Sequence, residues 1–184
     1  MQHFEFWPLP QINTQRLLLR QLLIKDTEEI FALRINEEVN KFIGRRVPDS
    51  LDDAKEFIRS INEGIAQKQT CYWAIVLKEN AKLIGTITLW QFSNEDNSAE
   101  LGYELHPDFQ HKGFMQEAIS AVIQFAFKDL QFKKLYAWTH RNNIASINLL
   151  KKNNFKRDEI AERKNAGAAI LKNMVIYFLD SAND

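Results

Sequence analysis

The stretch "LHPDFQHKGFMQEAISAVIQF" (residues 105–125) begins with the end of a β-rich run and finishes with an apolar helical pattern. The residues that recur at helical spacing are Met115, Ile119, Val122 and Ala126. They predict a helix from Gly113 to about Leu130, with this stripe facing the core. The next segment, "KLYAWTH" (134–140), is typical of a strand. Because a strand, helix, strand crossover favours parallel strands, we expect a sheet that contains a parallel pair.

The turn before this helix is basic and ends in a glycine. Its residues are Gln110, His111, Lys112 and Gly113. Free amides in the first turn of a helix, together with the helix dipole, bind phosphate oxygens, and Gly113 lets the backbone approach such a group closely. A pyrophosphate fits that description. The alternative is that Gly113 only eases a tight turn and Lys112 is solvated, and the spacing by itself leaves both interpretations open.

The segments around this stretch predict a sheet with helices on both faces. Strands are expected in "RLLLRQLLIKD" (16–26), "CYWAIVL" (71–77), "KLIGTITLW" (82–90) and "AELGYEL" (99–105), and in the tail within "FKRDEIAE" (155–162) and "AAILKNMVIYFL" (168–179). Helices are expected in "TEEIFALRIN" (27–36) after a capping-box-like Asp26 and Glu29, in "LDDAKEFIRSINEGIAQ" (51–67) after Ser50, and in "IASINLLKKN" (144–153). The polar turns between the middle three strands predict an antiparallel meander.

The expected fold class is therefore α/β of the α+β kind. Its central sheet is mixed and mostly antiparallel, and helices flank both faces. The chain has 184 residues and no internal repeat or linker, so we expect a single domain spanning residues 1–184.

The composition excludes several classes of partner. Twenty-four basic residues balance 24 acidic ones, so no net field attracts nucleic acid or an anionic membrane. The single cysteine, Cys71, cannot form an internal disulfide, and no apolar run is long enough to span a membrane. We expect a cytoplasmic protein without a membrane or nucleic-acid partner. Its oligomeric state stays open, and a homodimer is one of the possibilities.

Several familiar sites are absent from the sequence. It has no GxxxxGK[ST], no GxGxxG and no GxSxG pattern, which excludes the usual nucleotide-triphosphate, dinucleotide and hydrolase motifs. His106 and His111 lack the HExxH spacing and nearby thiols, so we expect no metal site.

Two segments resemble a known family. "QHKGFM" (110–115) is similar to the acetyl-coenzyme A signature of the Gcn5-related N-acetyltransferases (GNAT): Gln or Arg, two residues, Gly, one residue, then Gly or Ala. Gln110 and Gly113 match that pattern. "NIASINLLKKNNF" (143–155) resembles the family's second signature, in particular that of the ribosomal-protein N-terminal acetyltransferases (RimJ and RimL type). With "TQRLLLRQL" (14–22) and "AELGYEL", the resemblance covers about residues 14–177.

The resemblance implies a fold and a co-substrate. In this family the strand ending at Leu105 would splay from "KLYAWTH", and its free amides would bond the pantetheine arm of acetyl-coenzyme A (acetyl-CoA) as an added strand does. The implied cofactor-binding residues are Leu105, His106, Gln110, His111, Lys112, Gly113, Phe114, Met115, Asn143 and Ser146.

Three positions depart from the family's pattern. Met115 replaces the usual small residue, but its amide can still donate and its side chain can join the core stripe. Asn154 stands where Gly is usual, and asparagine tolerates the left-handed conformation best after glycine. Leu150 occupies the place of a tyrosine that acts as an acid in many relatives, so the proton donor is open.

Catalytic candidates come from the strand before the loop. Alternation along "AELGYEL" puts Glu100, Gly102 and Glu104 on one face. Glu100 matches the family's position for the base that deprotonates the amine, and Glu104 is the second candidate; the alternative is a solvated sheet face. Ser146 matches the serine of the ribosomal-protein branch as the donor to the leaving thiolate, unless it only bonds a helical carbonyl.

The acceptor is the least determined part. Phe42, Trp73 and Trp90 are candidates for an acceptor pocket, although core packing is the favoured role for each. A protein N-terminus, a polyamine, an aminoglycoside and a small metabolite all stay open. The sequence thus predicts transfer of an acetyl group from acetyl-CoA to a primary amine by direct attack on the thioester. The alternative is a non-catalytic acyl-CoA-binding or regulatory module.

Overall fold

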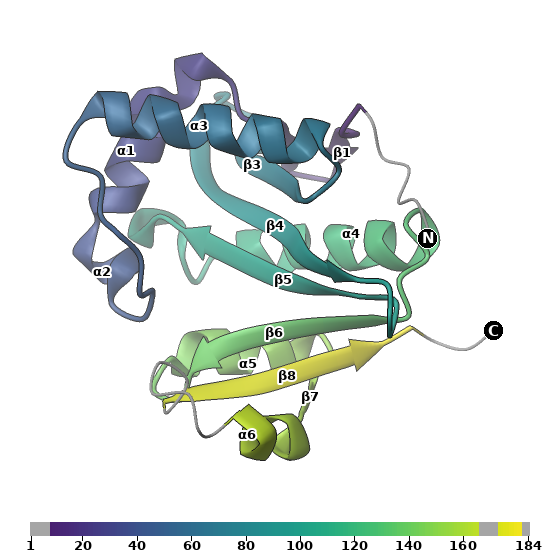
Figure 1. Ribbon diagram of the computed structural model, residues 1–184. Coiled ribbons are helices and arrows are strands. Elements are labelled where there is room, and N and C mark those ends of the chain that lie inside the picture. The colour runs from purple at the N-terminus through teal and green to yellow at the C-terminus, as the bar shows by residue number, and fades with distance from the viewer. Residues whose placement is uncertain (1–7, 166–172, 182–184) are drawn as a thin grey trace.

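One mixed sheet organises the protein (Figure 1). The computed structural model describes residues 8–165 and 173–181. Within them the strands are β1 (Ile12–Asn13), β2 (Leu17–Arg20), β3 (Cys71–Leu77), β4 (Leu83–Ser93), β5 (Ser98–Leu105), β6 (Lys134–His140), β7 (Lys156–Arg157) and β8 (Met174–Asp180). These described strands form an eight-stranded sheet in the order β1-β2-β3-β4-β5-β6-β8-β7.

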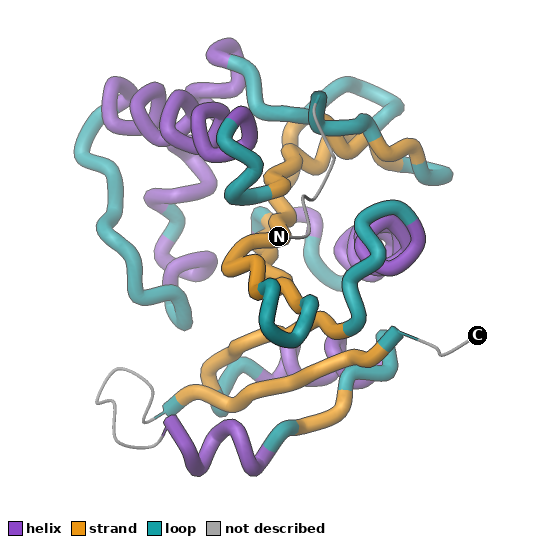
Figure 2. Tube along the Cα trace, turned by 45° about the vertical axis from the view of Figure 1, so that its right-hand side comes forward, coloured by secondary structure: helices purple, strands orange, loops and turns teal. Residues whose placement is uncertain are grey.

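The helices of the described residues lie on both faces of that sheet. They are α1 (Thr27–Ile35), α2 (Glu37–Asn40), α3 (Leu51–Ala66), α4 (Phe114–Lys128), α5 (Ile144–Lys152) and α6 (Glu159–Asn165), with short 3-10 turns η1 (Ile24–Asp26) and η2 (Pro107–Phe109). Figure 2 shows the sheet between the layer of α1 and α3 on one side and α4 on the other. The predicted fold class, mostly antiparallel with helices on both faces, is confirmed.

The direction of the strands follows from their connections. β3, β4 and β5 form the expected antiparallel meander, β2 pairs antiparallel with β3, and β5 and β6, which α4 connects, pair in parallel. α4 packs on the sheet through its predicted stripe, since Met115, Ile119, Val122 and Ala126 are all buried. The crossover prediction is therefore confirmed.

Each helical layer contacts the sheet through aromatic side chains. On one face the Phe57 ring of α3 meets Tyr72 of β3 edge-on, with centroids 5.9 Å apart. On the other face Phe125 of α4 meets Trp73 in the same way at 5.5 Å. Neighbouring residues of β3 thus anchor opposite layers, as the two-residue period of a strand requires.

A side-chain cap was predicted at the start of α1 and of α3, and only the cap of α3 is present. Ser50 caps α3 as predicted, because its side chain accepts a hydrogen bond from the amide of Asp53. The capping prediction for Asp26 is wrong: its carboxylate accepts from both Nη atoms of Arg20, at 2.6 and 2.7 Å, and from the amide of Leu23. A nearly buried carboxylate is better stabilised by a bidentate guanidinium than by a helix amide.

Two expected strands are shorter than predicted. The first ends at Arg20, where the chain turns toward η1. In the tail, β7 has two residues, and α6 follows it where a strand was expected. Asp158 begins α6, because its carboxylate accepts from the amide of Ala161, a signal that the sequence already contained. The part of the last expected strand at residues 168–172 lies outside the described residues.

Candidate active site

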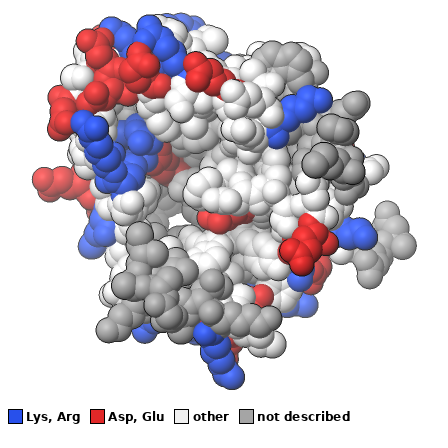
Figure 3. All heavy atoms as spheres, in the orientation of Figure 1, with Lys and Arg blue, Asp and Glu red and all other residues white. Residues whose placement is uncertain are grey.

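The β5–β6 ladder is short compared with its neighbours in the sheet. These strands pair only over Ser98–Glu100 and Lys134–Tyr136, whereas β5 stays paired with β4, and β6 with β8, much further along. The two strands therefore separate after Glu100, and the edge of β5 that faces β6 loses its ladder partner at residues 101–105. Figure 3 shows the face hollowed near its centre, with acidic side-chain atoms at the edge of the hollow.

The loop at the far end of β5 presents uncapped amides. Gly113 is the N-cap of α4 at φ 79°, in the left-handed region, and no side chain caps the first turn. His111 also has a positive φ, of 60°. The side chain of Gln110 turns back and donates to the carbonyl of Leu105, at 3.1 Å. These contacts shape a loop whose backbone N–H groups are available to an anion.

Arg16 braces this loop from the other end of the sequence. Its Nη1 donates to the carbonyl of Lys112 at 3.0 Å, and its guanidinium carbon lies 4.4 Å from the centre of the Phe114 ring. Glu117 holds Arg16 in place, accepting from its Nε at 2.7 Å and from its amide at 2.8 Å. Reasoning from the sequence missed Arg16, because its partners are about a hundred residues away. The one available signal was its position near the start of the family-like segment.

Glu100 stands at the point where the strands part. Burial raises the pKa of its carboxyl group to about 7, and a hydrogen bond from the Trp90 side chain offsets part of that rise. Trp90 is its cross-strand neighbour on β4. A carboxyl group with a pKa near neutrality is half-ionised at pH 7 and can accept a proton from an amine.

Glu104 has a different environment on the same face of β5. It is buried, with 9% of its surface exposed. Its Oε2 accepts from Nη1 of Arg45, and its Oε1 accepts from the hydroxyl of Thr86 at 3.2 Å. Because both oxygens have protein partners, the Glu104 side chain is held in place.

Ser146 lies against β5 from the opposite face. Its hydroxyl is 2.9 Å from the hydroxyl of Tyr103, and its amide donates to Oδ1 of Asn143. Burial raises the pKa of Tyr103 to about 12, and the hydrogen bond with Ser146 acts against that rise. Tyr103 thus brings a phenol close to the helix in which Leu150, buried in the core, replaces the family's tyrosine. No pattern in the sequence predicts this pairing, since Tyr103 has the features of an ordinary strand residue.

The remaining predicted cofactor residues line the loop and its two ends. Leu105 and Met115 are buried, His106 and Phe114 are half-buried, and Lys112 is exposed. His106 accepts a long bond from the amide of Asp108 as it begins η2. The buried side chain of Met115 joins the core, so only its amide faces the loop.

The aromatic candidates fall in different places. Trp90 is 42% exposed beside Glu100, and Phe42 stacks on His140 with ring centroids 5.3 Å apart. Trp73 is fully buried, and its Nε1 donates to the carbonyl of Pro10, which core packing alone explains. Trp138 was missed: Tyr136 pairs with Glu100, so Trp138, two residues on, shares that face and is half-buried.

The chain matches a family model. The model is that of the acetyltransferase (GNAT) domain, and it covers residues 16–156. The protein belongs to the GNAT acetyltransferase family. An N-acetyltransferase of Bacillus subtilis (strain 168) named YoaA, described as uncharacterized, is 32% identical over 151 residues, which are 82% of this chain and 85% of YoaA. The protein is accordingly an acetyl-CoA-dependent N-acetyltransferase.

Solved structures agree in fold. A ribosomal-protein-S5-alanine acetyltransferase from Vibrio fischeri superposes with a TM-score of 0.78 at 16% identity, covering 95% of this chain and 98% of that one. RimL, a ribosomal L7/L12 α-N-protein acetyltransferase solved with coenzyme A, gives a TM-score of 0.81 at 15% identity, over 95% of this GNAT chain and 100% of its own.

The residues that the structure describes contain neither a cluster of metal ligands nor a membrane-spanning helix. Within residues 8–165 and 173–181, no group of three or more His, Cys, Asp or Glu side chains could hold a metal ion. In the same ranges no helix is long and apolar enough to cross a membrane.

Proposed function

We propose that this enzyme transfers the acetyl group directly from acetyl-CoA to a primary amine, with Glu100 as the general base. The observation that carries the proposal is the pKa of Glu100, raised to about 7 by burial at the point where β5 and β6 separate. An alkyl amine is mostly protonated at neutral pH, so a base of matched pKa is the group that its reaction requires. Both a protein N-terminus and a small-molecule amine meet this description.

The residues of the chain fit acetyl-CoA in two respects. The uncapped first turn of α4, with Gly113 at φ 79°, suits a pyrophosphate. The edge of β5 at residues 101–105, without a strand partner toward β6, suits the amides of the pantetheine arm. Acetyl-CoA supplies the acetyl group as a thioester.

The reaction balances without a covalent enzyme intermediate. The amine nitrogen forms the new C–N bond, the C–S bond breaks, Glu100 accepts the amine proton and the coenzyme A thiolate leaves. Cys71, the single cysteine of the sequence, is fully buried, and burial raises the pKa of its thiol, so it is a poor nucleophile.

Tyr103 and Ser146 are proposed to stabilise the leaving thiolate. A thiol ionises near pH 8.5, well below the pKa of about 12 at Tyr103, so full proton transfer from the phenol is uphill. A hydrogen bond from Ser146, supported by the Tyr103 hydroxyl 2.9 Å away, is the contribution that this geometry allows. This pair would take the role of the tyrosine whose position Leu150 occupies in this chain.

An amine screen with thiol detection tests the proposal. We expect amine-dependent, steady release of coenzyme A, and no acetylated enzyme by intact mass spectrometry after mixing with acetyl-CoA alone. Turnover that continues through an acetylated protein residue would contradict direct attack. Failure of every amine, with acetyl-CoA bound by calorimetry, would contradict the choice of acceptor class.

A further inference from the structure

A buried cluster of charged side chains lies beside the candidate active site. We define the arginine cluster as Arg34 of α1, Arg45 of the loop before α3, and Glu104 of β5. Arg45 reaches Glu104 across 59 residues of sequence, and their side chains are 15% and 7% exposed. The cluster therefore sits under the loop that follows α2, on the same sheet face as Glu100.

Asn40 joins the two arginines. Its Nδ2 donates to the carbonyl of Arg34 at 2.6 Å, and its Oδ1 accepts from Nε of Arg45 at 2.8 Å. The side-chain amide of Asn40 thus links the backbone of Arg34 to the guanidinium of Arg45. The pKa of Arg34 is lowered, first by burial and then by the charge of Arg45, which agrees with this proximity.

Aromatic and hydroxyl groups complete the surroundings. The Arg34 guanidinium carbon lies 3.8 Å from the centre of the Phe57 ring, and Phe57 in turn meets Tyr72. The Tyr72 hydroxyl donates to Thr86 at 2.9 Å, and Thr86 donates to Glu104. Each oxygen of Glu104 therefore already has a protein partner, and among the described residues no ion pair joins Glu104 to Arg34, although the charge of Glu104 acts to raise the pKa of Arg34.

The charges in the cluster do not balance. Two guanidinium groups face one carboxylate, and Nη2 of Arg45 is buried without a hydrogen-bond partner among the described residues. In the same part of the chain, the guanidinium of Arg34 makes a contact with a ring but no ion pair. A buried unpaired donor or cation is costly, so its presence beside a reaction centre needs a reason.

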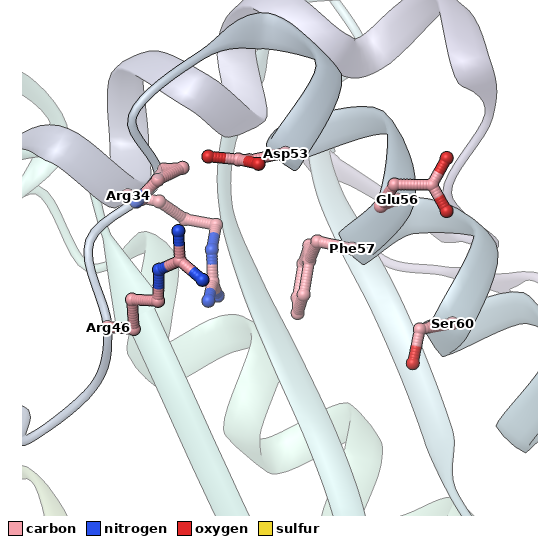
Figure 4. A pocket seen from close by; sticks show the side chains of 7 residues that line it. Arg34, Arg46, Asp53, Glu56, Phe57 and Ser60 are labelled. Carbon is pink, nitrogen blue, oxygen red and sulfur yellow. The ribbon is translucent and has the colours of Figure 1, made fainter.

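A pocket opens at the Arg34 end of the arginine cluster, and Arg45 and Glu104 are not among the residues that line it. A cavity of about 360 Å³ between α1, α3 and the loop before α3 is lined by Arg34, Arg46, Pro48, Asp53, Glu56, Phe57 and Ser60. Figure 4 shows the guanidinium groups of Arg34 and Arg46 pointing into it. The acids of this wall are partly engaged, since Glu56 pairs with Arg59 and Asp53 accepts from the amide of Asp49.

We infer that Arg34 and Arg45 form a subsite for an oxyanion carried by the acceptor, so that the acceptor is a small amine that also bears a carboxylate or a phosphate. This inference rests on the proposed transfer to an amine and names the class of that amine. Glu100 and Glu104 are four residues apart on one strand, about 13 Å between Cα atoms. An amine near Glu100 and an oxyanion near Arg45 can therefore belong to one small molecule.

The first experiment does not depend on activity. With coenzyme A at saturation to fill its own site, inorganic phosphate and acetate are titrated while the Nε–Hε signals of Arg34 and Arg45 are followed by NMR. We expect saturable shifts of both signals, and at least about tenfold weaker binding in Arg34→Gln. Arg163→Gln, which removes an exposed arginine of α6, is the matched control and should bind as the wild type does. Absence of a shift with both anions overturns the subsite.

The second experiment compares matched acceptors. The kcat/KM values are measured for ω-amino carboxylates of increasing length against their amides, and for ω-aminoalkyl phosphates of increasing length against the matching amino alcohols. We expect the anionic member of at least one pair to be favoured by about tenfold or more, and the ratio to fall toward one in Arg34→Gln. A ratio near one for all pairs in the wild type overturns the inference while leaving the proposed function intact. If no amine at all is acetylated, the proposed function fails, and the NMR titration still decides the subsite.

A double variant tests the role of Arg45 without leaving a buried charge unpaired. Removing Arg45 alone would leave Glu104 buried and unpaired, so Arg45→Met is combined with Glu104→Gln. A folded double variant that still shifts its Arg34 signal as the wild type does, with unchanged anion affinity, contradicts the role of Arg45.

Discussion

At the scale of single residues, the two carboxylates of β5 differ in what surrounds them. Glu104 is bonded by Arg45 and Thr86, whereas Glu100 is partly buried and accepts a hydrogen bond from the Trp90 side chain. A group bonded on both oxygens is fixed, and one whose pKa lies near 7 can take and release a proton at physiological pH. We therefore propose Glu100 as the base and Glu104 as a positioning residue.

Replacing Glu100 by glutamine tests the base. Glu100→Gln should lower turnover by roughly 100-fold at pH 7, because the amide cannot accept the amine proton. The loss should shrink at higher pH, where more of the amine is already neutral. Steady-state kinetics across pH, with Glu104→Gln in parallel, measures both effects. A deficit that is the same at every pH would indicate a structural carboxylate.

The same residue makes a prediction for stability. The folded pKa of about 7 lies above the value of 4.5 for an exposed glutamate, so ionisation of Glu100 disfavours the folded state, and stability falls as pH rises from about 4.5 through 7. Glu100→Gln removes this loss. We expect the variant to be more stable than the wild type at pH 8 by about 1 to 3 kcal/mol and about equal at pH 4, measured by urea denaturation. Equal stability at both pH values would mean that the carboxyl group is well solvated.

At the scale of elements, the loop between β5 and α4 combines a local and a distant determinant. Gly113 adopts its left-handed conformation within the loop, and Arg16 holds the loop from the segment before β2. A side chain at position 113 would be strained by the positive φ, and its Cβ would lie 3.3 Å from Nη2 of Arg16. The shape of the loop therefore depends on both residues.

Gly113→Val should weaken acetyl-CoA binding by at least about tenfold, which corresponds to about 1.4 kcal/mol. The reason is the strained backbone and the added bulk where a pyrophosphate would approach. Calorimetry measures the affinity, and Lys112→Ala serves as the comparison, since an exposed lysine contributes only a screened charge. Unchanged affinity in a folded Gly113→Val variant would disprove the assignment of the loop.

The contact between β5 and α5 carries a prediction for turnover. Tyr103→Phe and Ser146→Ala should each lower kcat by about five- to tenfold without raising the KM for acetyl-CoA. The double variant should lose little more than either single one, because both act through one hydrogen bond. Losses that multiply in the double variant would mean that the two hydroxyls work separately.

At the scale of the whole molecule, the enzyme consists of two parts of one sheet joined at a narrow point. β5 and β6 share three paired residues, and beyond them the stack of Phe42 on His140 connects the loop after α2 to the end of β6. An opening of this kind exposes amides of β5 that a sheet would otherwise pair. Acetyl-CoA should occupy that edge.

Hydrogen exchange tests this arrangement. Binding of coenzyme A should slow exchange at residues 101–105 and in the first turn of α4, because amides that lack a partner gain one. Mass spectrometry with and without the ligand measures the change, and β2, far along the sheet, is the internal reference. Protection confined to the α4 turn would show that the β5 edge does not bind the arm.

The features that depend on local spacing could be predicted from the sequence. The stripe from Met115 to Ala126 specified α4, the β-rich runs specified the meander, and the crossover specified the parallel pair. Gly113 marked the turn that we propose as an anion-binding site, and Asn154 adopts the left-handed conformation expected of it, at φ 64°. These features are readable because helical and strand periods, and the backbone freedom of glycine and asparagine, are properties of neighbouring residues.

Which side chains meet, in contrast, depends on the packing of the whole fold. Strand alternation put Glu100 and Glu104 on one face but could not distinguish them, since the difference lies in Arg45, 59 residues from Glu104, and in the burial of Glu100. The pairing of Tyr103 with Ser146 joins residues 43 apart. Partners across such separations are brought together by the packing of whole elements, and no periodicity of the sequence encodes them. The acid–base properties of this site, and the uncompensated charge beside it, therefore arise from the fold.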